Sequence, residues 1–273
     1  MIRRFDRYEF KYLISVKLRD QLIREMEVHT EQDAHDHQTG YPLVSLYYDS
    51  PSLDCFWAKV DGLKFRRKVR VRIYPEQDIE KTRVGMLEIK QRTASTVQKR
   101  RIGLPLERAE ALCDGRIGVS DLGPLDALDE QVASEVEYLV HALHLRPTAI
   151  TAYNRRAFVG AQYEPGLRIT FDTQLSGRVH ALRVNASAPN RLIAPADWCV
   201  MEVKTNNKVP NWVSSMLARH NCQLRRISKY CATLSKLAQL GVPHVEIPNR
   251  AEREPQEQPL QALPVKQLGN VRS

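Results

Sequence analysis

The stretch FRRKVRVRIY, at residues 65–74, alternates basic and apolar side chains. Successive side chains of an extended chain point to opposite faces, so the basic residues at the even-numbered positions 66–72 share one face. Val69, Val71 and Ile73 lie on the other face, and Arg67 is the exception. The pattern therefore predicts a β-strand that has one apolar face and one basic face.

Similar alternation recurs elsewhere in the chain, at residues 7–14, 85–91, 97–104, 167–173 and 198–204. Taken singly, each stretch is compatible with a strand whose charged face is solvated. Solvated faces usually mix charges of both signs, however, whereas these faces are mostly Lys and Arg. The recurrence favours strands whose basic faces point inward around a common tunnel. Such a tunnel would need a polyanionic occupant, because its cations repel one another.

The rest of the chain fits an α+β fold. Further strands are predicted at residues 43–49, 150–159 and 178–184, and helices are predicted to start near Ser15, Ser50, Pro210 and Ser228. The apolar period becomes helical between residues 105 and 147, which predicts a helical insert within the strand series. We expect residues 1–243 to form one domain and the Pro-, Gln- and Glu-rich residues 244–273 to be a disordered tail.

Composition narrows the class of partner. The 273 residues carry a formal net charge of +9, and much of the excess lies on the predicted strands rather than in a terminal arm. This favours a shaped anion site and disfavours nucleic acid as the ligand, because no stacking platform is interleaved with the cations. The five cysteines include no CxxC pair, which predicts reduced thiols and a cytoplasmic location. Neither a signal peptide nor a transmembrane segment is expected, and no membrane partner is identified.

Eight short motifs carry a resemblance to a known family. In their order and spacing, over about residues 3–240, they resemble the VTC domain, the polyphosphate polymerase branch of the CYTH-like triphosphate tunnel metalloenzymes. The motifs are RYEFKY (7–12), VRVRIY (69–74), LEIK (87–90), KRR (99–101), YNRRAF (153–158), LRITFDT (167–173), MEVK (201–204) and RISKY (226–230).

The resemblance implies a fold and an activity. The expected fold is an antiparallel eight-stranded β-barrel, the triphosphate tunnel, with helices packed outside. The expected activity is transfer of the γ-phosphate of ATP to a growing polyphosphate chain, with manganese or magnesium as the divalent metal. ATP, polyphosphate, and pyrophosphate or phosphate are the implied partners.

The resemblance also assigns roles to residues. The catalytic phosphate contacts would be Lys11, Arg70, Arg72, Lys90, Arg155, Arg168 and Lys204. Further substrate contacts would be Lys99, Arg101, Arg226, Ser228 and Lys229. Glu202 matches the metal-binding glutamate, and Glu88 is either a second ligand or a partner for tunnel lysines. Ser228 at a helix start suits a phosphate, although a plain helix cap is the alternative.

Two other functions stay open on the same fold. One is a metal-dependent triphosphatase, in which water replaces the phosphate acceptor, and the other is a non-catalytic polyphosphate-binding module. The hydrolytic branch carries Glu-x-Glu-x-Lys on its first strand, whereas Arg7 takes the place of the first Glu here. This difference favours the polymerase. A purine could stack on Tyr47, Tyr48, Tyr153 or Trp198, or these rings could form the barrel wall.

Overall fold

The computed structural model describes residues 8–248 except for residues 35, 37–38, 76–77, 95, 162–163, 207, 244 and 246. Arg7 and almost all of the predicted tail at 244–273 therefore lie outside the described residues. The elements are β1 (Tyr8–Ser15), α1 (Val16–Met26), β2 (Thr30–Gln32), β3 (Tyr41–Asp49), α2 (Asp54–Val60), β4 (Phe65–Ile73), η1 (Ile79–Lys81), β5 (Val84–Thr93), β6 (Thr96–Pro105), α3 (Leu106–Cys113), η2 (Val119–Leu122), α4 (Ala127–Leu143), β7 (Arg146–Gly160), β8 (Arg168–Arg178), β9 (Arg191–Leu192), β10 (Trp198–Thr205), α5 (Asn211–Arg219) and α6 (Lys229–Gln239).

The strands form one antiparallel sheet that curls until its two edges come close. The strand order is β1-β10-β8-β7-β3-β4-β5-β6, while β2 pairs with β7 and β9 pairs with β8. Within the described residues, no backbone ladder joins β1 to β6. The prediction of an eight-stranded barrel is wrong on this point, because the sheet has ten strands and is not closed.

The segment that follows α5 runs back along β1 and occupies part of the edge that β6 leaves unpaired. Leu224 forms a β-bridge with Tyr12, and the Arg225 amide donates to the Lys11 carbonyl at 2.8 Å. This segment therefore covers part of the free edge of β1, where a closed barrel would place β6. We call the boundary between β1 and β6 the seam.

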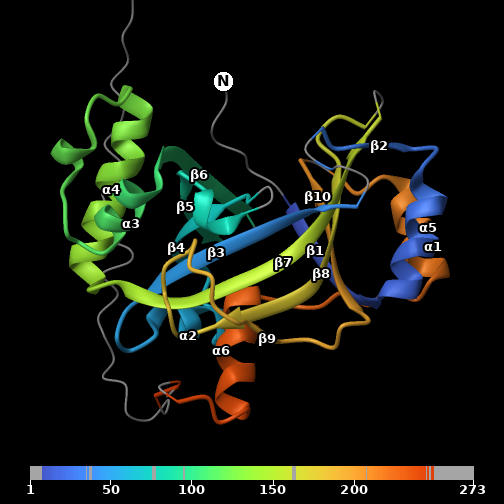
Figure 1. The fold of residues 1–273 in the computed structure, drawn as a ribbon. Helices are drawn as coiled ribbons and strands as arrows, with labels where there is room; N and C mark the ends of the chain where they lie inside the picture. The colour runs from blue at the N-terminus through green and yellow to red at the C-terminus, as the bar shows by residue number, and fades with distance from the viewer. Residues whose placement is uncertain are drawn as a thin grey trace, which may run out of the picture.

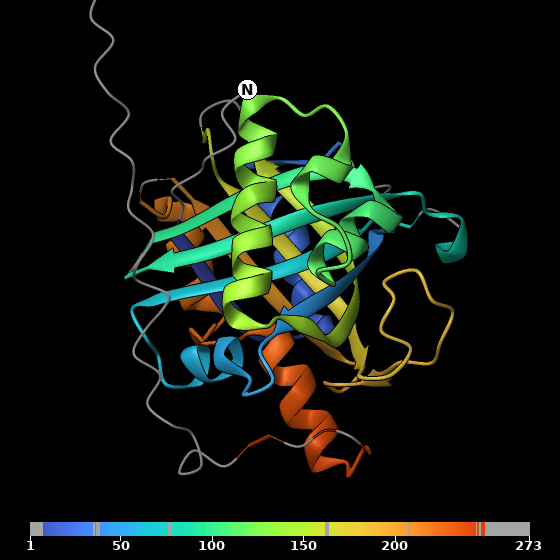
Figure 2. The ribbon, with the colours of Figure 1, turned by 90° about the vertical axis from the view of Figure 1, so that its left-hand side faces the viewer.

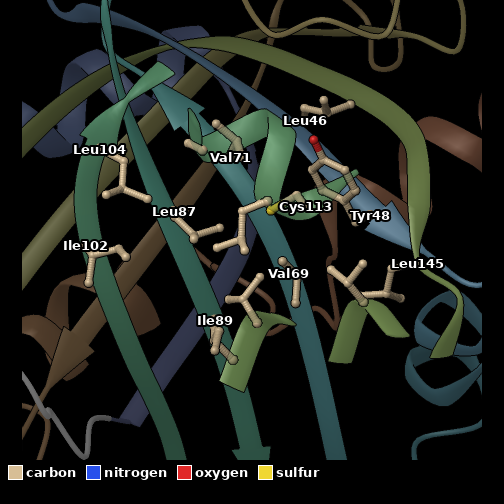
Figure 3. Packing of buried hydrophobic residues seen from close by; sticks show 14 of the residues in the cluster. Leu46, Tyr48, Val69, Val71, Leu87, Ile89, Ile102, Leu104, Cys113 and Leu145 are labelled. Atoms are coloured by element: carbon tan, nitrogen blue, oxygen red, sulfur yellow. The ribbon is translucent and has the colours of Figure 1, made fainter. Parts of the chain in front are cut away.

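One half of the sheet turns its apolar face outward, toward α3 and α4. Val69, Val71, Leu87 and Ile89 alternate with the basic residues of β4 and β5 and are buried in this core. Figure 3 shows these side chains together with Leu104. In Figure 2, α4 crosses in front of the strands of this half. The helices therefore cover the apolar side chains, and the polar face is left on the inside of the curl.

The other half is covered by α1 and α5, which lie opposite α3 and α4 in Figure 1. Phe171 and Met201 of the sheet pack with Leu22 of α1 and Met216 of α5. As predicted, α1 begins after Ser15, whose Oγ accepts a hydrogen bond from the Leu18 amide at 3.1 Å. Both apolar faces thus point away from the inside of the curl. None of the helices in the described parts of the chain is long and apolar enough to cross a membrane.

The first turn of α6 lies on the inside of the curled sheet. The predicted start is confirmed, since Ser228 is the N-cap. The buried Tyr230 donates its hydroxyl hydrogen to Asp49 Oδ2 at 2.5 Å, and α6 packs against β7, β8 and α2. In Figure 1, α6 lies beneath β7 and β8. The residues at the start of this helix can therefore reach the inner face of the sheet.

Three local predictions need correction. The strand predicted at 178–184 is wrong, because β8 ends at Arg178 and a loop follows, in which three backbone carbonyls accept hydrogen bonds from the Arg178 guanidinium. Val184 lies in this loop but is buried in the core beside α3 and α4. Its amide donates a hydrogen bond to Glu110 Oε1 at 2.8 Å. The helix predicted to open at Ser50 begins at Asp54, because Leu53 adopts a left-handed conformation. Residues Thr30–Gln32 form the short strand β2, which is absent from the strands predicted above.

Candidate functional site

The inner face of the sheet gathers basic side chains from most of its strands. They come from residues far apart in sequence, and most of them are linked through a smaller number of carboxylates. The basic residues are Lys11, Lys68, Arg70, Arg72, Lys90, Lys99, Arg155, Arg168, Lys204 and Lys229, and their partner acids are Glu9, Asp33, Glu88, Asp172 and Glu202.

Glu202 of β10 lies at the centre of one cluster. Its Oε1 accepts hydrogen bonds from Lys11 Nζ and Lys229 Nζ, both at 2.8 Å, and its Oε2 is 2.7 Å from Lys204 Nζ. Burial disfavours the ionised carboxylate, but the charges of Lys11 and Lys204 outweigh burial and hold the pKa of Glu202 well below its usual range. Glu202 therefore stays ionised and neutralises part of the charge of three lysines.

Asp172 of β8 anchors a second cluster beside the first. Arg155 of β7 donates from Nε to Oδ1 at 2.6 Å and from a terminal nitrogen to Oδ2 at 2.8 Å, a bidentate pair. Lys229 Nζ lies 2.6 Å from the same Oδ2, so this lysine bridges Asp172 and Glu202. Asp172 is fully buried, and removing its arginine would leave a buried charge with a single partner.

A third cluster lies on β4, β5 and β6. Glu88 is fully buried, accepts from Arg70 Nε at 2.6 Å and forms an ion pair with Lys99. Arg70 also donates to the hydroxyl of Tyr47 at 2.8 Å. Glu88 thus serves as a partner for inner-face cations. Lys90 crosses the seam instead, to Glu9 Oε2 at 2.8 Å.

Arg72 differs from the other inner-face arginines. Its Nε donates to Ser45 Oγ at 2.9 Å and a terminal nitrogen donates to the Tyr153 hydroxyl at 2.8 Å. Among the described residues it forms no ion pair with a carboxylate. Neutral partners therefore fix a buried guanidinium without cancelling its charge, which is a suitable arrangement for binding a phosphate. Lys68 is similar, since its Nζ donates to Ser228 Oγ at 3.1 Å.

Three residues assigned from the family resemblance lie outside these clusters. Arg168 pairs with Asp33 and donates to the Tyr41 hydroxyl at 3.3 Å, near the start of β8. Arg101 stands opposite Glu88 in the ladder but is exposed. Arg226 is exposed in the segment before α6.

Sequence reasoning left four contributors out of the assigned site: Lys68, Glu9, Asp33 and Asp172. Lys68 belongs to the basic face of residues 65–74, so alternation was a usable signal for it. Asp172 lies within the LRITFDT motif. Its bidentate pairing with Arg155 depends on strand register, which the sequence does not reveal.

Several inner-face lysines have lowered pKa values. Burial lowers the pKa of Lys99 to about 7, and Arg70 and Arg72 add to this effect although Glu88 opposes it. Burial, with the nearby charge of Arg155, likewise lowers the pKa of Lys204 to about 8 against the opposing effect of Glu202. The charged forms of these two lysines are therefore disfavoured without an added anion, whereas nearby carboxylates outweigh burial and raise the pKa values of Lys11 and Lys229.

We expect tripolyphosphate binding at pH 8 to take up protons. A bound anion favours the charged form of Lys99 and Lys204, raises their pKa values and so draws protons from the buffer. The binding enthalpy at pH 8 should then depend on the ionisation enthalpy of the buffer, measured by titration calorimetry in phosphate-free buffers. At pH 6 both lysines are already protonated, so their proton uptake should vanish and the remaining buffer dependence should come from protons released by the terminal phosphates of tripolyphosphate, which titrate near this pH. A buffer-independent enthalpy at pH 8 would contradict the prediction.

The lowered pKa values of Lys99 and Lys204 also predict how the free energy of unfolding changes with pH. In the unfolded chain a lysine has a pKa of about 10.4. Between about pH 8 and pH 10 the unfolded state therefore binds more protons than the folded state, and the free energy of unfolding of the ligand-free protein rises with pH from these groups.

The donor set fits a divalent metal that binds together with phosphate. In the described portion of the chain, no three His, Cys, Asp or Glu side chains gather as metal ligands. Glu202 and Glu9 are nevertheless neighbours, since Lys11 Nζ lies 2.8 Å from one and 2.9 Å from the other. Magnesium commonly binds through one or two carboxylates plus substrate phosphates, a requirement that this pair can meet.

Comparison with solved structures found distant likenesses. A candidate adenylate cyclase from Bacillus halodurans aligns with a TM-score of 0.48 and 10% identity, covering 83% of this chain and 96% of that chain. A candidate adenylate cyclase from Vibrio parahaemolyticus aligns with a TM-score of 0.39 and 10% identity, covering 80% and 87%. A search of curated proteins found no match.

Comparison with family models gave a match over nearly the whole chain. The model of the VTC domain matches residues 6–238, a span that includes every cluster described above. The family that the motifs indicate is thereby confirmed, and the protein belongs to the VTC domain family.

Proposed function

We propose that the protein is a polyphosphate polymerase, which transfers the γ-phosphate of ATP to the end of a polyphosphate chain on the inner face of the sheet. The observation that carries this proposal is the excess of inner-face cations over carboxylates, with Arg72 held by neutral partners alone. Membership of the VTC domain family supports a site for a triphosphate.

The chemical problem is the repulsion between two anions. Phosphoryl transfer needs positioning and charge neutralisation more than covalent help from the protein. Arg70 and Arg72 come from one face of β4 and can each donate to two phosphate oxygens. Every charge-assisted hydrogen bond contributes on the order of 1.5–3 kcal/mol. Several such bonds bring the acceptor phosphate close to the γ-phosphate, and this acceptor, already an anion, needs no general base.

Glu202 and Glu9 would hold a manganese or magnesium ion together with triphosphate oxygens. When bound, the metal neutralises charge on the phosphates. Lys11, Lys204 and Lys229 already contact Glu202, so they lie where phosphate oxygens around such a metal can also be bound. These lysines orient the triphosphate and lessen its repulsion of the incoming chain.

The test is to incubate the purified chain with ATP and manganese. The products are resolved on a gel stained for polyphosphate, beside an assay for free phosphate. A ladder of long polyphosphate is the expected result. Free phosphate without polymer would replace the proposal by a triphosphatase. Neither product, together with tight tripolyphosphate binding, would replace it by a binding module.

A further inference from the structure

Two tyrosines meet where β3 begins and β4 ends. The ring centroids of Tyr41 and Tyr74 are 6.2 Å apart, with their planes inclined by 42°. Tyr41 is the first residue of β3, and Tyr74 directly follows the last residue of β4. Tyr74 is 39% exposed, so part of this residue is accessible to a ligand.

This pair borders the inner face. Alternation along β3 places Tyr41 on the side of Ser45 and Tyr47, whose hydroxyls accept from Arg72 and Arg70. The Tyr41 hydroxyl itself accepts from Arg168 at 3.3 Å. Tyr74 lies two residues after Arg72 in the chain. The partly exposed Tyr74 therefore lies beside Arg72, which forms no ion pair with a carboxylate in the described part of the chain.

The other aromatic residues considered from the sequence are unsuitable for stacking. Tyr47, Tyr48 and Tyr153 are all buried. Trp198 is partly open but starts β10, six residues before Lys204, a separation of about 20 Å along a strand. Tyr74 thus combines an exposed ring with a position beside the phosphate-binding cations.

We propose that Tyr41 and Tyr74 form a nucleobase site, in which the purine of the donor stacks on Tyr74 while its phosphates extend past Arg72. This inference rests on the proposed function only in taking a nucleoside triphosphate as the ligand. Stacking is tolerant of base identity, because every base presents a π face. ATP and GTP should therefore bind with similar affinity.

The experiment compares two ligands on matched variants. Affinities for ATP and for tripolyphosphate are measured by titration calorimetry without divalent metal, so that no turnover occurs. Tyr74→Leu should weaken ATP binding about tenfold, equivalent to about 1.4 kcal/mol, and leave the affinity for tripolyphosphate within about twofold. Tyr74→Phe keeps the ring and should retain ATP affinity. Tyr138→Leu, an exposed tyrosine of α4, is the control and should change neither affinity.

The possible outcomes distinguish a failure of the nucleobase site from a failure of the proposed polymerase activity. Equal losses for ATP and tripolyphosphate in Tyr74→Leu would overturn the base site, and so would unchanged affinities for both. A protein that forms no polymer, yet loses ATP affinity alone in Tyr74→Leu, supports the base site and removes the polymerase. Polymer formation with an unchanged ATP affinity in Tyr74→Leu overturns the base site alone.

Discussion

Replacing Arg72 with Met is expected to lower kcat/KM for polymer formation from ATP at least about 100-fold, a loss of about 2.7 kcal/mol of transition-state stabilisation. The melting temperature should change little. The reason is that Arg72 donates to Ser45 and Tyr153, so its removal leaves no buried carboxylate without a partner. It removes a cation that Arg70 repels but that Tyr153 and Glu88 attract, so these effects on stability oppose one another. Activity and stability should therefore separate in this variant.

Two further variants make the comparison sharp. Arg155→Met leaves the fully buried Asp172 with Lys229 as its remaining ion-pair partner, so its melting temperature should fall along with activity. Arg24→Met, on the exposed face of α1, should change neither quantity. Differential scanning fluorimetry and the polymer assay give both readouts. A marked fall in the melting temperature of Arg72→Met would show that Arg72 is needed for the fold rather than for phosphate.

Glu202→Gln should have the largest effect on the stability of the ligand-free protein. Lys11, Lys204 and Lys229 would lose a shared counter-charge in a buried setting. Removing one partner of a buried ion pair costs about 3–5 kcal/mol. At roughly 2–4 °C per kcal/mol, the melting temperature should fall by about 6–20 °C. Metal-dependent polymer formation should be lost as well.

Tripolyphosphate should return much of this stability, because it supplies negative charge to the three lysines. The control is Glu135→Gln on the outer face, where Glu135 Oε1 pairs with Arg100 at 2.7 Å. That variant should also melt earlier, but tripolyphosphate should raise its melting temperature no more than it raises that of the unmodified protein. A Glu202→Gln protein with an unchanged melting temperature, or with full activity, would refute the role given to this carboxylate.

The sequence predicted the faces of the strands because alternation is a local property. Val71 and Arg72 point to opposite sides as soon as the backbone is extended, and the structure places Val71 in the outer core and Arg72 on the inner face. The start of α1 at Ser15 and of α6 at Ser228 also follows from local capping chemistry. The motifs together predicted the family, which the comparison confirmed.

What the sequence did not predict depends on contacts between distant segments. Whether the sheet closes depends on how β1 meets β6 and on the return of the chain at Leu224, and no periodicity encodes either. The bidentate pair of Arg155 with Asp172 requires the register of β7 against β8. The pair formed by Tyr41 and Tyr74 likewise comes from the ends of two strands that meet only after folding.

The seam affects how a long polyphosphate chain can reach the inner face of the sheet. A closed barrel admits a long chain only by threading from a free end, since sideways passage would break a ladder of backbone hydrogen bonds. Here the side chains of Lys90 and Glu9 join β5 to β1 across the seam. The Glu9 side chain of this pair is only 10% exposed, so the pair is stronger than one on the open surface, but it is a contact between side chains and not a backbone ladder. Within the described residues, opening this side of the sheet to a looped or end-blocked polyphosphate would break that ion pair without breaking any ladder between β1 and β6.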